Sequence, residues 1–105
     1  MRMWMVDPKI LCRKHLLGEH VELHMLVGSI KRNRSIDGFV RDGLISTQHI
    51  SSRHTALVQE MKARGYNHQS PLVYRDTLKR GSVNVGASVD ELRRRCAACK
   101  ALQDE

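Results

Sequence analysis

The chain has 105 residues and is strongly basic, with 18 lysines and arginines against 11 acidic residues and a formal net charge of +7. This charge makes a polyanion, above all nucleic acid, the first expected partner, and the alternative is a solvated basic surface without a partner. An apolar content of 41% in this length supports one modest core and argues against two independent domains. We therefore expect a single domain over residues 1–105.

The sequence contains no segment that suggests export or a membrane. Its apolar runs fall short of the ~18 residues that a spanning helix needs. The opening MRMWMVDP is interrupted by charge and proline too early for a signal peptide. Three cysteines, an odd number, argue against a disulfide framework. These features predict a cytoplasmic protein without a membrane partner or an obligate protein partner.

The first element predicted is a long helix. Asp7 and Pro8 are typical of a helix start, and the apolar residues that follow have helical rather than alternating spacing. We expect this helix to run from about residue 8 to 31. The next stretch, KRNRSIDGFVRDGLIS, carries six charges and two glycines and predicts an irregular basic loop over residues 31–46.

Two further helices are predicted. Leu57, Val58 and Met61 indicate a helix from about residue 51 to 64, which Gly65 would end. Residues 66–87 mix Pro, Gly, Asn and Ser with short apolar pieces and predict a loop. Ser88 and Glu91 have the spacing of a capping box for a last helix that ends near residue 102. The predicted fold is all-α, a compact single domain of about three helices joined by long basic loops.

The first predicted helix carries a dense polar run, LCRKHLLGEHVELH. At 100° per residue, His15, Glu19 and Glu22 share one narrow face, with Leu11 and Leu26 beside it. Apolar neighbours desolvate a carboxyl group and raise its pKa, which suits it to proton transfer. The alternative for this face is an ordinary surface ion pair of Glu19 with a basic neighbour.

Other residues in and after this run leave a metal site open. His20 and His24 form an i,i+4 pair on another face of the helix, a spacing that can bind a metal but is also common at a polar margin. Cys96 and Cys99 have metal-ligand spacing, and Cys12 with His15 could complete a four-ligand zinc site. A lone C-x-x-C is a weak signal, so we expect packed or exposed thiols and neither a metal nor a cofactor.

Four segments, in order and spacing, resemble one known family. They are Met1-Arg2-Met3, the run HLLGEHVEL over residues 15–23, Val40-Arg41-Asp42, and Arg64-Gly65-Tyr66-Asn67. The second is similar to the family's H-L-x-x-E-x-x-E-L and the fourth to its R-G-F-N. The family is that of the pyrimidine-dimer DNA glycosylases with abasic-site lyase activity, the phage endonuclease V type.

The resemblance implies an enzyme that acts on damaged or modified double-stranded DNA without a metal. The amine of the first residue would attack the anomeric carbon of the sugar, release the base and form an imine, and β-elimination would then break the strand. An α-amine ordinarily titrates at roughly 7.7–8.0, well below a lysine, so part of it is neutral and nucleophilic near pH 7. The large Arg2 side chain should keep the initiator methionine in place, so the nucleophile would be the amine of Met1.

The resemblance also assigns roles to particular residues. It implies Met1, Glu22 and His15 as catalytic residues, with Glu22 as the proton-transferring carboxylate, and Glu19 in a supporting position. Arg2 would contact the DNA backbone. Further DNA-binding residues are expected among the basic groups that follow: Lys31, Arg32, Arg34, Arg41 and Arg64. The triplet Arg93 to Arg95 spreads over 200° of a helix and is expected to be a solvated face.

The chain departs from the phage enzyme in two places that concern DNA grip and damage recognition. Val21 and Met25 stand where that enzyme carries arginines, and the chain ends in CAACKALQDE instead of an aromatic-rich tail. Two other functions therefore remain as alternatives. One is a non-catalytic DNA-binding module, whose binding would not change with Glu22→Gln. The other is a zinc-dependent nucleic-acid-binding or nuclease domain.

Overall fold

The computed structural model describes residues 1–67 and 70–105, and in these the regular structure is entirely helical. The all-α prediction is confirmed, but the count of about three helices is too low. Five α-helices and two short 3₁₀ helices follow one another in the described residues: η1 (Pro8–Ile10), α1 (Arg13–Lys31), α2 (Asp37–Arg41), η2 (Thr47–His49), α3 (Ile50–Ala63), α4 (Val85–Arg95) and α5 (Ala97–Gln103). None of the helices described is at once long and apolar enough to cross a bilayer.

The first predicted helix, residues 8–31, is broken in two. Asp7 caps η1 by accepting a hydrogen bond from the Lys9 amide at 3.0 Å, as the Asp-Pro start predicts. The backbone then becomes extended at Leu11 and Cys12, and α1 begins only at Arg13. Leu11 is fully buried, so the break turns its side chain into the core. Burying a leucine side chain contributes about 1.5–3 kcal/mol, which helps offset the interruption of the helix.

The predicted loops contain helices that sequence spacing did not reveal. α2 lies within residues 31–46. Of the loop expected over residues 66–87, residues 68 and 69 lie outside the described part, and α4 already begins at Val85. Asn84 is its N-cap, because the Asn84 side chain accepts from the Ala87 amide at 2.9 Å. The capping box at Ser88 is therefore wrong, and Ser88 is buried inside the helix.

The predicted last helix also breaks, at Cys96. The Cys96 backbone is extended (φ −135°, ψ 108°), and the Cys96 sulfur accepts from the Cys99 amide at 3.4 Å at the start of α5. By contrast, the end predicted for the central helix is confirmed. α3 ends at Ala63 with Arg64 as C-cap, and Gly65 has a positive φ of +80°.

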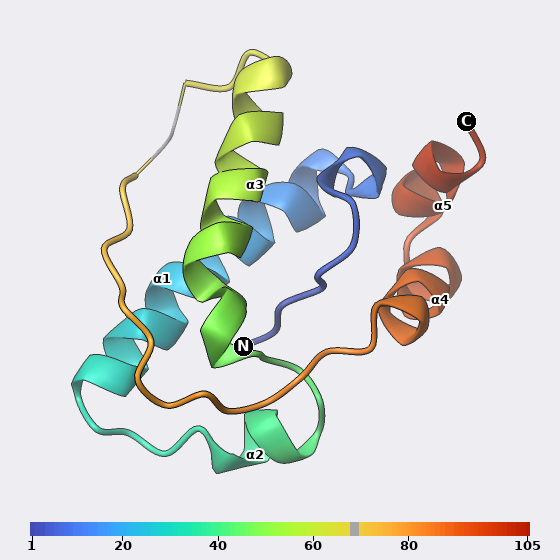
Figure 1. Ribbon diagram of the computed structural model, residues 1–105. Coiled ribbons are helices and arrows are strands. Elements are labelled where there is room, and N and C mark those ends of the chain that lie inside the picture. Colours follow the sequence, from blue (N-terminus) through green and yellow to red (C-terminus); the bar gives the residue numbers. More distant parts are fainter. Residues whose placement is uncertain (68–69) are drawn as a thin grey trace.

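The N-terminal segment runs through the middle of the molecule. In Figure 1 it passes between the pair α1 and α3 on one side and the pair α4 and α5 on the other. Met3 is buried and its amide donates to the Leu44 carbonyl at 2.7 Å. The core around it draws on every long helix and includes Leu16, Leu23, Leu26, Leu57, Met61 and Leu92. This packing fixes the first residues of the chain against α1.

A buried ion pair joins α1 to α3. Arg53 donates to both carboxylate oxygens of Glu19, and its Nη2 lies 2.9 Å from Oε1. The exposed fractions of the two side chains are 5% and 0%. Arg53 also donates to the Val6 carbonyl. Glu19 thus holds the helix pair and the N-terminal segment together, instead of forming the surface pair considered above.

Gly81 is required where the segment before α4 passes residue 45. Its φ is +85°, and a β-carbon there would lie 2.3 Å from the Ile45 carbonyl oxygen. Gly81→Ala should therefore lower the free energy of unfolding by about 1–3 kcal/mol in urea denaturation. Gly18→Ala is the matched control, because a β-carbon in that helical position meets nothing within 4 Å and should be neutral or stabilising. An unchanged urea midpoint for Gly81→Ala would contradict this packing.

Candidate functional site

A cleft of about 590 Å³ opens between the N-terminal segment, α1 and the end of α4. His15, Glu19 and Glu22, predicted to share a helix face, all line it. The N-terminal segment contributes Arg2 and Trp4, and the other charged residues of its wall are Lys14 and Arg95. The Glu19 side chain is fully buried in its pair with Arg53, so the cleft combines one accessible carboxyl group, that of Glu22, with several cations and an aromatic ring.

Glu22 is half-buried in the wall of this cleft, next to the start of the chain. Burial raises the pKa of its carboxyl group, and the charge of Glu19 adds to this. The positive charge of the N-terminal amine, the Arg2 backbone amide and the Arg2 side chain lower the pKa in the opposite direction, but burial prevails. A raised pKa makes the carboxylate a stronger base, which suits it to remove a proton.

Arg2 is held by an aromatic ring and a carboxylate. Its guanidinium carbon lies 3.8 Å from the centroid of the Trp4 ring, and its Nη2 donates to Glu91 at 2.6 Å. Arg95 donates to the other oxygen of Glu91 at 2.9 Å. These two arginines hold the pKa of Glu91 below its usual range. Arg2 is thus positioned at the cleft.

Sequence reasoning missed three residues of this arrangement: Trp4, Glu91 and Arg95. Arg95 was expected on a solvated helix face, and although its side chain is half-exposed it also lines the cleft. The i,i+4 spacing of Glu91 and Arg95 was a usable signal. The contact of Glu91 with Arg2 spans 89 residues and had no local signature.

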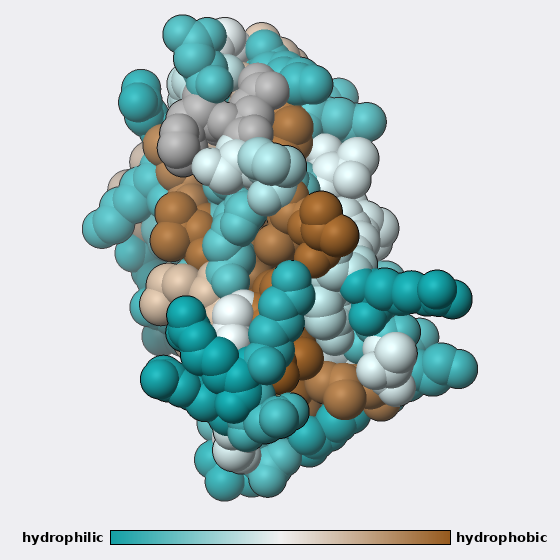
Figure 2. Space-filling view, turned by 90° about the vertical axis from the view of Figure 1, so that its left-hand side faces the viewer, coloured by the Kyte–Doolittle hydropathy of each residue, from teal (hydrophilic) through white to brown (hydrophobic). Residues whose placement is uncertain are grey.

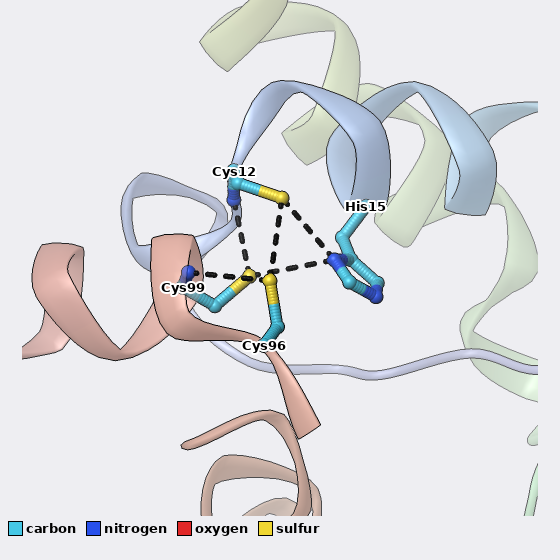
Figure 3. Close-up of side chains that lie close together, drawn as sticks. All are labelled: Cys12, His15, Cys96 and Cys99. Carbon is cyan, nitrogen blue, oxygen red and sulfur yellow. Dashed lines mark hydrogen bonds between the residues drawn. The ribbon is translucent and has the colours of Figure 1, made fainter. Parts of the chain in front are cut away.

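His15 lies where the cleft meets a cluster of sulfur atoms. Its ring packs edge-on against Trp4, with centroids 5.8 Å apart. Nδ1 faces two sulfurs, Cys12 Sγ at 3.2 Å and Cys99 Sγ at 3.5 Å. The other ring nitrogen points away from the sulfurs (Figure 3). Burial, together with the charges of Lys14 and Arg95, lowers the pKa of the imidazole.

The thiol cluster joins Cys12 and His15 to Cys96 and Cys99. One ligand atom from each of the four residues lies within 4.8 Å of the others (Figure 3). A second group, away from this one, brings His54 of α3 to His20 and His24, with the His20 and His54 rings stacked at 4.9 Å. The sequence suggested His20 and His24 as a pair, and His54 was missed because it lies on another helix.

The basic residues predicted to bind DNA fall into two kinds. Lys31, Arg32, Arg34 and Arg41 are exposed. The end of α1 and the loop after it lie on the left of Figure 1, the side that Figure 2 presents, where hydrophilic side chains project around apolar patches. Of the exposed residues, Lys31 donates to the Val73 carbonyl and Arg41 pairs with Asp42. Arg64 differs, because its side chain is largely buried against the segment before α1. It bonds to Glu60 at 2.8 Å and to the Leu11 carbonyl at 2.7 Å.

Comparison with known proteins identifies the class of this enzyme. Residues 1–73 match the family model described as pyrimidine dimer DNA glycosylase. No curated protein and no solved structure matches the chain. Because the family match covers more than half of the sequence, the chain belongs to the pyrimidine dimer DNA glycosylase family.

Membership makes the protein a DNA-repair enzyme, a glycosylase with abasic-site lyase activity that acts on damaged DNA. The family resemblance predicted from the sequence is thereby confirmed. The matched range contains Met1, Arg2, His15 and Glu22, and it ends before α4 and α5. The C-terminal helices, which bring Arg95 to the cleft and Cys96 and Cys99 to the thiol cluster, therefore lie outside the family match.

Proposed function

We propose that the protein removes a damaged or modified base from double-stranded DNA and cuts the strand at the abasic site through an imine on the α-amine of Met1. The observation that carries this proposal is the position of Glu22, a partly desolvated carboxyl group in the wall of the cleft that interacts with the Arg2 backbone amide and with the charge of the N-terminal amine. Met1 itself lines a separate pocket, which it shares with Arg32 and Arg34. A nucleophilic amine and a base of raised pKa are the two groups that the reaction requires.

In the first step the neutral amine attacks C1′ of the sugar. The bond between C1′ and the base breaks, and the base leaves with a proton from the attacking nitrogen. The nitrogen lone pair then forms the C=N bond as the C1′–O4′ bond breaks, and O4′ takes a proton from solvent, which gives the open-chain iminium ion. At a site that has already lost its base, the amine adds to the sugar aldehyde and water leaves. Glu22 lies beside the start of the chain, and its negative charge stabilises the cationic iminium.

In the second step the iminium ion acidifies the C2′ proton. The Glu22 carboxylate removes that proton, the electron pair forms the C2′–C3′ double bond, and the 3′ phosphate leaves. Water then hydrolyses the imine and releases the enzyme. We propose that Arg2 and His15 position the sugar and its phosphates, because both line the cleft next to Glu22.

We further propose that Lys31, Arg32, Arg34 and Arg41 contact the phosphates of the duplex. Their exposure supports this role. Arg64, which the family resemblance also assigns to DNA, is proposed as an indirect contributor, because its bonds to Leu11 and Pro8 hold the chain just before α1.

The experiment that tests this function is an analysis of the strand ends. A duplex with one abasic site is incubated with the protein, and both new ends are identified by mass spectrometry. β-Elimination leaves an unsaturated aldehyde at the new 3′ end of one fragment and a phosphate at the new 5′ end of the other. A hydrolytic nuclease leaves no unsaturated sugar. Binding without cleavage would support the non-catalytic alternative, and hydrolytic ends would support the nuclease.

The phosphate contacts predict a change in the salt dependence of binding. Each lost contact on duplex DNA lowers the magnitude of the log-log slope by about 0.9, so Arg32→Ala with Arg34→Ala should lower it by about 1.8. The control removes the same charge from α4, with Arg93→Ala and Arg94→Ala, and should leave the slope near that of the unmodified protein. Fluorescence anisotropy at several salt concentrations measures both. Equal losses in the two variants would contradict a local phosphate site.

A further inference from the structure

We propose that Cys12, His15, Cys96 and Cys99 bind one structural zinc ion. Three thiolates and one imidazole are a common ligand set for structural zinc, and such sites are tetrahedral and closed. Cys12 and His15 come from the start of α1, and Cys96 and Cys99 come from the start of α5. The ligands thus form two pairs, each with two residues between its members.

The distances of the pairs Cys12–Cys96, Cys12–His15 and Cys99–His15 fit a tetrahedron around one ion, and all four ligand atoms lie within 4.8 Å of one another. With Zn–S near 2.3 Å and Zn–N near 2.0–2.1 Å, tetrahedral geometry puts sulfurs about 3.8 Å apart and sulfur about 3.5 Å from nitrogen. Cys12 Sγ lies 3.8 Å from Cys96 Sγ, and His15 Nδ1 lies 3.2 Å and 3.5 Å from the sulfurs of Cys12 and Cys99. An iron–sulfur cluster would need its ligands farther apart, because the cluster itself lies between them.

The backbone around the sulfurs supports thiolates. The Cys12 amide donates to Cys99 Sγ at 3.2 Å, and the Cys99 amide donates to Cys96 Sγ at 3.4 Å. Amide groups directed at ligand sulfurs orient metal ligands and stabilise their negative charge. Zinc with three thiolates and a neutral imidazole carries a net charge of −1, and the cations of Lys14 and Arg95 lie near the imidazole. The surroundings therefore match the charge of the occupied site.

A disulfide explains the cluster less well. The sulfurs of Cys12 and Cys96 are too far apart for a bond, which is about 2.05 Å long. Any single disulfide would also involve only two of the sulfurs and would not explain why the third thiol and the His15 nitrogen lie beside them. One metal ion can be coordinated by all four groups.

The metal would fasten the C-terminal helices to the catalytic half of the molecule. Two of its ligands lie within the family match and two lie outside it. Arg95, which lines the cleft and shares Glu91 with Arg2, directly precedes Cys96. Binding through Nδ1 also leaves the other nitrogen of His15 protonated, so that His15 donates a hydrogen bond. His15 would then position substrate without acting as a base, which makes its two roles compatible.

The test is the zinc content and ligand set of the intact protein, without DNA. Protein purified without chelators should contain about one equivalent of zinc, and X-ray absorption should give three sulfurs at about 2.3 Å and one nitrogen at about 2.0–2.1 Å. Cobalt-substituted protein should show thiolate charge-transfer bands and the visible bands of tetrahedral Co²⁺. These measurements use the unmodified sequence and do not depend on whether variants fold.

Variants separate this site from the histidine group on the other side of α1. Cys96→Ser should lose most of the zinc, whereas His24→Gln should keep about one equivalent. Less than about half an equivalent in the unmodified protein, or an absorption spectrum with nitrogen ligands only, would overturn the proposal. Because no DNA is present, failure here would leave the imine mechanism untouched, and absence of cleavage would leave the zinc site untouched.

Discussion

Replacing Glu22 with glutamine should slow strand cleavage at an abasic site by about 10²–10⁴-fold, the usual contribution of a positioned acid–base group. Glutamine has the same shape but cannot accept the C2′ proton, so DNA affinity should stay within about threefold of the unmodified protein. Single-turnover cleavage and anisotropy measure the two quantities separately. The matched control is Asp90→Asn, which removes one negative charge from an exposed position on α4 and should cleave normally.

Glu22 also shapes the acid side of the pH profile. It must be ionised to remove a proton, and burial raises its pKa. Protonation of the attacking amine already slows cleavage as the pH falls, so loss of the Glu22 carboxylate should appear as a further, steeper fall through a value above the ordinary glutamate pKa of about 4.3, and Glu22→Gln should lack this steeper part. Ionisation of Glu22, which favours activity, has the opposite effect on the stability of the fold. A folded-state pKa above the unfolded value means that ionisation costs stability at neutral pH, so Glu22→Gln should be at least as stable as the unmodified protein. A variant that lost activity only because it unfolded would contradict this account.

Removing Arg53 should cause the largest loss of stability. Arg53→Met leaves the Glu19 carboxylate, whose exposed fraction is 0%, without its partner in the interior. Breaking a buried pair from one side costs about 3–5 kcal/mol, because an uncompensated charge remains. Urea denaturation at neutral pH measures this loss.

Two further variants test whether burial is the cause. Arg53→Met combined with Glu19→Leu removes both charges and should recover most of the stability. Arg93→Met breaks the exposed pair with Asp104 and should cost no more than about 1 kcal/mol. If Arg53→Met were no more destabilising than Arg93→Met, the pair would not hold α1 and α3 together as described.

Helical periodicity was sufficient to predict the helix face that borders the cleft. His15, Glu19 and Glu22 lie within one stretch of α1, so their angular separation follows from sequence distance alone, and all three line the cleft. The end of α3 was predictable for a similar reason, because Gly65 adopts the positive φ that glycine favours after a helix. Both features depend on residues that are close in sequence, and such features can be predicted from helix periodicity and capping rules.

The remaining features depend on contacts between distant segments. Cys12 meets Cys96 across 84 residues, and Arg53 meets Glu19 across 34. No periodicity encodes such pairs, so the sequence showed the ligand spacing of the two cysteine segments but not that these segments meet, and the partner of Arg53 was not predicted. The start of α4 was misplaced because Asn84 and Ser88 are both good caps, and only the packing of Ser88 into the interior decides between them.

The central claim is that the reacting nitrogen is the α-amine of Met1, and trapping followed by peptide mapping tests it most directly. Sodium borohydride reduces an imine to a stable bond, so protein incubated with abasic-site duplex should be captured covalently. Mass spectrometry should then place the sugar on the N-terminal peptide, at the α-nitrogen. Lys14, which also lines the cleft, is the competing amine, and Lys14→Arg should still be captured. An adduct on Lys14, or no adduct at all, would contradict the mechanism.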